Sequence, residues 1–180
     1  MTVVETRPGL RAAAAPAPEP LAASARRALA VLRILLGSVF LWAFVDKAFG
    51  FGFATPPERA WIAGGSPTTG YLGNLEGTLA PVFGALAGQA WVDVSFMLGM
   101  LAVGAALVLG IALRAAAVGG TLIMGLMWLS ALPLANNPLV DEHLIYAAAL
   151  WVLAAARAGR TWGLARTWES LAHRRLRLLG

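Results

Sequence analysis

The chain has 180 residues, of which 59% are hydrophobic and only 13% are charged. A soluble domain carries about 45–50% apolar and about 25% charged residues, so the composition excludes an ordinary soluble domain and indicates one integral membrane domain. The absence of cysteine excludes disulfides and thiolate chemistry on this chain, and the net charge of +5 is better explained by membrane topology than by nucleic acid, which is not an expected partner.

Residues 1–27 are rich in alanine and proline and predict a disordered cytoplasmic segment. The first apolar run, residues 28–49, is long enough to cross the ~30 Å hydrocarbon layer of a bilayer. Arg33 lies near the start of this run. We expect its side chain to snorkel to the cytoplasmic phosphates or to pack between helices, in preference to forming an anion site.

Residues 50–91 form a long outer loop with structure of its own. Within it, Thr55 precedes two prolines and Glu58 follows three positions later, which predicts a helix capped by Thr55 with Pro56 at its first position. The apolar stretch 79–91 contains proline and glycine breaks and is too short to span a bilayer. We expect it to be interfacial or re-entrant.

Three further spans follow, at residues 92–113, 115–134 and 139–158, so that the transmembrane domain covers 28–158. Arg114 alone separates the second span from the third, which indicates a tight hairpin. Residues 159–180 predict a basic amphipathic helix on the cytoplasmic membrane surface, or a solvated tail helix. The expected fold is all-α: an integral membrane four-helix bundle with a long structured outer loop after the first helix and an amphipathic C-terminal tail helix.

Basic residues gather at one end of these spans and only Lys47 and Arg59 at the other. The positive-inside rule then predicts a multi-pass protein of the cell membrane with both termini in the cytoplasm. The lipid bilayer is its first expected partner. The middle of the later spans is almost purely apolar, with Thr121 and Ser130 as the weak exceptions, which disfavours a solute or proton pathway.

Polar residues collect at the predicted outer ends of the spans. Asp46 and Lys47 end the first span, and Asp141, His143 and Tyr146 open the fourth. Ionisable groups near lipid are costly and are usually paired or functional, so these five are the candidate catalytic residues. The alternative is ordinary decoration of helix ends.

His143 and Tyr146 share a helical face and could relay protons to a quinone-like carbonyl, although a lone histidine at a helix start also serves as a structural hydrogen-bonding group. Trp42 and Trp61 are candidates for the cofactor-binding side of such a pocket, with an aromatic belt at the membrane surface as the alternative. No spacing matches a metal site. Haem is disfavoured because His143 and His173 are predicted on opposite sides of the membrane. No covalently bound cofactor is expected.

Several segments between about residues 30 and 157 resemble the DoxX/DoxD-like membrane proteins. The resemblance rests on these residues: Arg33-Ile-Leu-Leu-Gly, Phe40-Leu-Trp-Ala-Phe-Val-Asp46-Lys47, the block 50–70, Gly110-Ile-Ala-Leu-Arg114, Asn137-Pro138, Asp141-Glu142-His143 and Tyr146-Ala147. It implies a four-helix membrane bundle and a role as the DoxD-type subunit of a thiosulfate:quinone oxidoreductase, with quinone as co-substrate.

On this reading thiosulfate would bind near Lys47 and Arg59, and quinone would enter from lipid beside Trp42, His143 and Tyr146. A second oxidoreductase subunit is then an expected partner, and the glycine-rich faces of the second and third spans allow a homo-oligomer. Other family members accompany oxidative-stress complexes, so the alternative is a non-catalytic membrane anchor or assembly partner of a redox complex.

Overall fold

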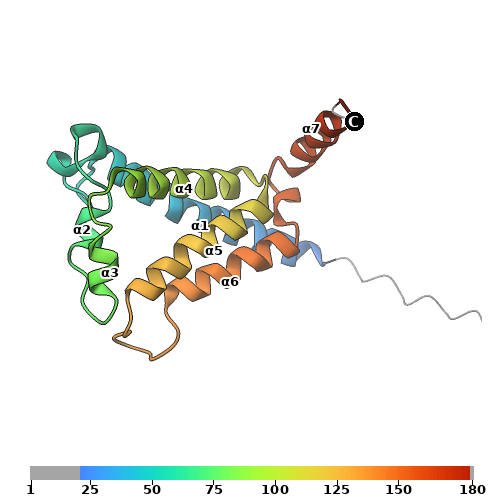
Figure 1. The fold of residues 1–180 in the computed structure, drawn as a ribbon. Helices are drawn as coiled ribbons and strands as arrows, with labels where there is room; N and C mark the ends of the chain where they lie inside the picture. Colours follow the sequence, from blue (N-terminus) through green and yellow to red (C-terminus); the bar gives the residue numbers. More distant parts are fainter. Residues whose placement is uncertain (1–20, 179–180) are drawn as a thin grey trace, which may run out of the picture.

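The computed structural model describes the backbone of residues 21–178 and the side chains of residues 21–171. All regular elements in these residues are helices, which confirms the all-α prediction. Four helices run roughly along one direction (Figure 1): α1 (Ala23–Phe49), α4 (Ala90–Leu109), α5 (Leu113–Ser130) and α6 (Glu142–Ala155). Helix α1 packs against α4, α4 against α5 and α5 against α6, and α6 also contacts α1.

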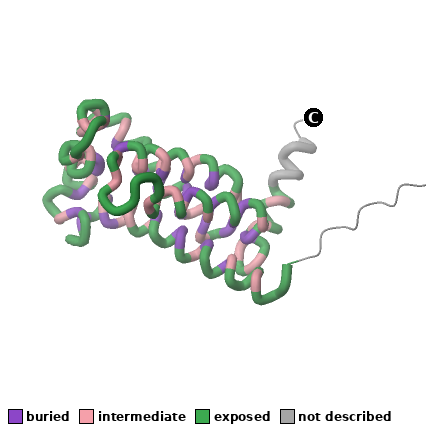
Figure 2. Tube along the Cα trace, turned by 90° about the horizontal axis from the view of Figure 1, so that it is seen from below, coloured by how far each residue is buried: buried purple, intermediate pink, exposed green. Residues whose placement is uncertain are grey.

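Three of these helices, α1, α4 and α5, are long and apolar enough to cross a membrane. In lipid a helix is the natural form for such runs, because it satisfies its backbone hydrogen bonds internally. Helix α6 has 14 residues and so extends about 21 Å, less than the ~30 Å hydrocarbon thickness. Buried positions follow the inner sides of the helices, and exposed positions face outward (Figure 2). Large apolar side chains occupy that outward surface, among them Leu35, Val39, Leu98, Val118 and Leu122.

Several helix ends differ from the predicted ends. Arg114, predicted to separate the second span from the third, lies inside α5, and α5 ends at Ser130, before the predicted end at residue 134. Helix α1 begins at Ala23, so residues 23–27 of the predicted disordered segment are helical, whereas residues 1–20 lie outside the described part of the chain. Helix α4 ends at Leu109, before the predicted end at residue 113. The reason is Gly110, whose φ of 71° lies in the left-handed region that a glycine adopts without strain.

The contact between α1 and α4 depends on small residues. A Cβ atom added to Gly104 would lie 2.8 Å from both the backbone nitrogen and the Cγ of Leu41. A backbone atom cannot rotate away, so the two helices would have to separate. Gly125 in α5 offers a matched comparison, because a Cβ atom there would have no neighbour within 4 Å.

We therefore expect Gly104→Ala to lower the free energy of unfolding by about 1–3 kcal/mol through overpacking. Gly125→Ala should be neutral or should stabilise α5 by up to about 1 kcal/mol, the helix-propensity gain of alanine. Thermal unfolding of both variants in the same detergent checks this prediction. Equal stability of the two variants would contradict the close approach of α1 and α4 at Gly104.

Residues 50–89, here named the connector, fold across one end of the bundle, the connector end (Figure 1). They contain η1 (Pro57–Arg59), η2 (Trp61–Ala63), α2 (Thr69–Leu72) and α3 (Ala80–Gly84). The predicted helix from Thr55 is instead two separate 3₁₀ turns without a side-chain cap. Pro56 has extended backbone, with ψ of 155°. A residue that precedes proline is disfavoured in helical conformation, and Pro56 precedes Pro57.

The opposite end of the bundle carries the turn between α4 and α5, then η3 (Ala158–Arg160) and α7 (Ala165–Leu178). We name it the arginine end, after Arg114, Arg157 and Arg160. The predicted C-terminal tail thus contains a helix, whereas its place on a membrane surface stays a prediction. Arg160 and Glu169 form an ion pair there, with 2.8 Å between Nη2 and Oε2.

Candidate functional site

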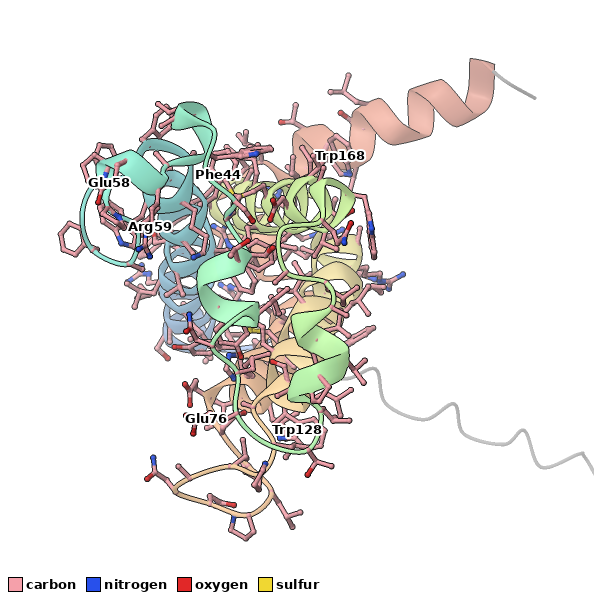
Figure 3. The ribbon with its side chains drawn as sticks, turned by 60° about the vertical axis from the view of Figure 1, so that its left-hand side comes forward. Phe44, Glu58, Arg59, Glu76, Trp128 and Trp168 are labelled. Atoms are coloured by element: carbon pink, nitrogen blue, oxygen red, sulfur yellow. The ribbon has the colours of Figure 1, made fainter. Side chains whose placement is uncertain are left out.

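A cavity of about 330 Å³ lies at the connector end, between the connector and helices α4 and α5. Its walls are mainly apolar and aromatic, as is usual for sites that bind small lipophilic molecules. The lining residues on the connector are Pro67, Thr68, Tyr71, Leu72, Phe83 and Leu86. Those on the long helices are Lys47, Trp91, Val92, Ser95, Phe96, Leu122, Ile123, Leu126, Met127 and Ser130. Figure 3 shows the connector helices in front of this end of the bundle.

Lys47 supplies the only cationic group of the cavity lining. It lies in the last turn of α1, where the negative end of the helix dipole favours a positive charge. The side chain is partly buried, and among the described residues no hydrogen bond or ion pair occupies its ammonium group. An ammonium group with three donor hydrogens beside an apolar cavity is available to a ligand oxygen.

Asp46, the neighbour of Lys47, forms hydrogen bonds with the connector backbone. Its carboxylate is buried and accepts hydrogen bonds from the backbone N–H groups of Phe53 at 3.3 Å and Ala54 at 3.0 Å. These bonds hold the chain as it turns back after α1. Asp46 therefore stabilises the start of the connector, and the lysine beside it is left to face the cavity.

A second polar group joins the connector to α5 across the cavity. The Tyr71 and Ser130 hydroxyl oxygens are 2.9 Å apart, and Ser130 Oγ donates to the Met127 carbonyl at 2.8 Å. Since Ser130 has one hydroxyl hydrogen, Tyr71 is the donor between the two. Tyr71 thus donates its hydrogen within the protein, and the remaining polar donors of the lining include the Lys47 ammonium group and the Ser95 hydroxyl.

Asp93, in the first turn of α4, holds the connector in place. Its Oδ1 accepts three hydrogen bonds: from Ser66 Oγ at 3.0 Å, from the Thr68 N–H at 3.1 Å and from Thr68 Oγ1 at 2.6 Å. Asp93 and Thr68 are both buried. Hydrogen bonds to a buried carboxylate are strong, so this group fixes the wall of the cavity that Thr68 and Tyr71 form.

The other predicted site residues lie outside the cavity lining. Asp141 is the N-cap of α6 and accepts hydrogen bonds from the N–H groups of His143 at 3.0 Å and Leu144 at 3.3 Å. The His143 ring also pairs with it, with 2.8 Å between Nδ1 and Oδ2. Tyr146 is partly buried against the core of the bundle. The structure thus gives Asp141 and His143 a helix-capping geometry.

The two predicted cofactor-side tryptophans are also elsewhere. Trp42 is 47% exposed, and its ring stacks on Phe51 and meets Phe53 edge-on, with centroid distances of 6.0 and 5.1 Å. Trp61 belongs to η2, which packs against α1. Arg59 is exposed on the connector, and Figure 3 places it with Glu58 on the α1 side, away from α2 and α3.

Asp141 gives a prediction of stability. Its carboxylate caps α6, so its removal leaves the N–H groups of His143 and Leu144 in the first turn without their acceptor.

We expect Asp141→Ala to lower the free energy of unfolding by about 1 kcal/mol at neutral pH, the usual cost of a lost N-cap. Glu142→Ala, which removes the exposed carboxylate next to it, should cost only about 0.3–1 kcal/mol through the helix dipole. Unfolding of both variants in the same detergent, followed by helical circular dichroism, checks this prediction. An Asp141→Ala variant as stable as the wild type would contradict the capping role.

Most of the cavity lining was not predicted from the sequence. Tyr71, Phe83 and Trp91 fall within residues 50–91, which the sequence predicted only as an outer loop with structure of its own. One sequence signal could have predicted this cavity: the apolar stretch 79–91 directly precedes a span that begins with a carboxylate, Asp93. Comparisons with models of protein families, with curated proteins and with solved structures find no match.

Proposed function

We propose that this chain is a DoxX/DoxD-like membrane protein that binds a quinone-type molecule in the cavity at the connector end, as a subunit of a quinone-linked oxidoreductase acting on thiosulfate. The observation that supports the binding part of this proposal is that Lys47 is the one cationic residue in the lining of a mainly apolar cavity. The enzymatic part and the substrate come from the resemblance of the sequence segments described above.

The walls of the cavity fit a molecule that arrives from lipid. Trp91, Leu122 and Leu126 line the cavity and are also exposed on the outside of α4 and α5, at 64%, 63% and 47%. A ligand can therefore pass sideways between the bilayer and the cavity without crossing water. The apolar lining suits a ring with a hydrocarbon tail, and Lys47 donates a hydrogen bond to one ring carbonyl.

Reduction of a quinone requires two electrons and two protons. Lys47 stabilises the negative charge that develops on the carbonyl oxygen as electrons arrive. Thiosulfate is the proposed reductant: two thiosulfate ions join through a new S–S bond to give tetrathionate and release the two electrons, and the two protons come from water. The electrons pass to the quinone directly or through a partner subunit. Transfer through a partner corresponds to the second role considered from the sequence, in which the chain anchors or helps to assemble a redox complex and is not catalytic itself.

The proposed topology has four spans, with α6 as the last. The loop 131–141 and η3 at its two ends would make up the remaining depth of the bilayer. Arg114, Arg157 and Arg160 would face the cytoplasm by the positive-inside rule, and the cavity would open near the outer surface. Helix α7 would then lie along the cytoplasmic membrane surface.

The test is a quinone titration of purified protein in nanodiscs. Lys47 is the only lysine of the chain, and Lys47→Met removes the ammonium group while keeping an unbranched apolar side chain one atom shorter. We expect this variant to bind quinone at least about tenfold more weakly, the cost of a lost hydrogen bond from a charged donor. Arg59→Met, which removes an exposed cation at the same end, should bind as wild type does. Equal binding by all three proteins would refute the site.

The same preparation decides between the two roles. Thiosulfate-dependent reduction of a quinone analogue that is lost in Lys47→Met would make the chain catalytic. Quinone binding without any turnover by folded protein would instead favour the anchor role, and the electron donor would then be sought among proteins that copurify with the chain.

A further inference from the structure

A second cavity, of about 620 Å³, lies at the arginine end, between the start of α5, the end of α6 and the start of α7. Three arginines line it: Arg114, Arg157 and Arg160. Glu169 is the one carboxylate of the lining and is ion-paired with Arg160. The lining therefore keeps a net positive charge. This cavity is at the opposite end of the bundle from the proposed quinone site.

The backbone adds to this positive character. Helix α5 begins at Leu113, and Leu113, Arg114 and Ala115 of its first turn all line the cavity. Within the described residues no side chain caps the N–H groups of this turn. Uncapped N–H groups at the start of a long helix, together with the helix dipole, favour an anion.

A buried cation lies directly behind the cavity wall. Arg33 is fully buried, and its guanidinium donates to backbone carbonyls of α4 and of residues 161 and 162, while its Nε has no partner among the described residues. A Cβ atom on Gly110, a lining residue, would lie 2.9 Å from Arg33 Nη1. In this region of low dielectric constant, a charge without a carboxylate partner raises the positive potential of the cavity.

We infer that this cavity binds the phosphate headgroup of an anionic phospholipid. Arginine guanidinium groups match phosphate oxygens in pairs, and three exposed arginines line this cavity. Nearby residues suit the rest of a lipid: Leu109 and Leu164, each next in the chain to a lining residue, are exposed and offer apolar surface to acyl chains. Trp168, which Figure 3 shows at the start of α7, lines the cavity with an amphipathic ring typical of the membrane interface.

The lipid would bridge three parts of the chain. The headgroup would bridge α5 through Arg114, the segment after α6 through Arg157 and Arg160, and α7 through Trp168. Basic pockets of this kind at the ends of membrane helices recognise anionic headgroups rather than zwitterionic ones. Binding should therefore weaken with added salt.

The experiment uses the full chain in phosphatidylcholine nanodiscs with increasing phosphatidylglycerol, and native mass spectrometry counts the retained lipids. Wild type should retain phosphatidylglycerol in preference to phosphatidylcholine, and the double variant Arg114→Gln/Arg160→Gln should lose at least about tenfold in affinity. The matched control is Arg27→Gln/Arg166→Gln, which removes two exposed arginines outside the cavity lining and should bind as wild type does.

Two results would overturn the inference. One is equal retention of phosphatidylglycerol by the two double variants. The other is glycerol phosphate in water protecting the wild type from heat as well as the lipid does, which would assign the cavity to a soluble phosphate compound. If Arg114→Gln/Arg160→Gln unfolds in phosphatidylcholine alone, the lipid preference of the wild type remains a test. A wild-type protein that retains phosphatidylglycerol no better than phosphatidylcholine would overturn the inference.

Discussion

Replacing Arg33 with methionine should lower the free energy of unfolding by about 3 kcal/mol. Arg33 is fully buried and donates to the carbonyl oxygens of Leu107, Val108, Thr161 and Trp162. The Leu107 carbonyl also accepts from the Gly110 N–H, so the other three carbonyls depend most on the guanidinium. Methionine keeps the volume but removes the donor of these part-buried acceptors, at about 1–3 kcal/mol for each group that finds no replacement.

The measurement is reversible unfolding of purified protein by a denaturing detergent, with helical circular dichroism as the readout. Arg27→Met is the matched control, because Arg27 is an exposed arginine near the start of the same helix. It should unfold within about 0.5 kcal/mol of wild type. If Arg33→Met is as stable as this control, the guanidinium does not hold α1, α4 and the segment after η3 together.

Replacing Asp93 with alanine should release the connector from the bundle. The variant removes three hydrogen bonds to one buried carboxylate oxygen and leaves the Thr68 N–H and hydroxyl buried without an acceptor. We expect a local cost of about 2–4 kcal/mol, with faster amide hydrogen exchange across residues 66–88 and little change in the four long helices. Because the connector forms one wall of the cavity, quinone binding should weaken together with the loss of protection.

Glu76→Ala is the control, since Glu76 is an exposed carboxylate on the same connector. Its exchange rates and quinone affinity should match those of wild type. A connector that stays protected in Asp93→Ala would show that apolar packing of Phe83 and Leu86 suffices to hold it, and the role given to Asp93 would be wrong.

The membrane character of the chain could be read from the sequence because it depends on the length of apolar runs, and α1, α4 and α5 follow from those runs directly. The ends of helices depended on single residues. Gly110 ends α4 through its left-handed backbone, and Pro57 keeps Pro56 extended and prevents the helix predicted from Thr55. Backbone preferences of single glycine and proline residues are worth only a few kcal/mol. They compete with side-chain packing, which cannot be read from a hydrophobicity pattern.

Candidate site residues could be predicted by position along a span, but not by the direction in which they point. Asp46 and Lys47 are adjacent, yet one binds the backbone of the connector and the other lines the cavity. The sequence favoured snorkelling or helix packing for Arg33, and its guanidinium in fact binds carbonyls from two distant parts of the chain. These partners lie up to 129 positions from Arg33 in the sequence, so only the three-dimensional arrangement identifies them.

The most direct test of the proposed site is photolabelling of the wild-type protein in nanodiscs with an azidoquinone, followed by peptide mapping. The account predicts label on residues 67–72, 83–96 and 122–130, which surround the cavity, and prevention of that label by excess unmodified quinone. Label on the segment of His143 and Tyr146 instead, or label spread evenly over the outward surface of the helices and insensitive to competition, would contradict it.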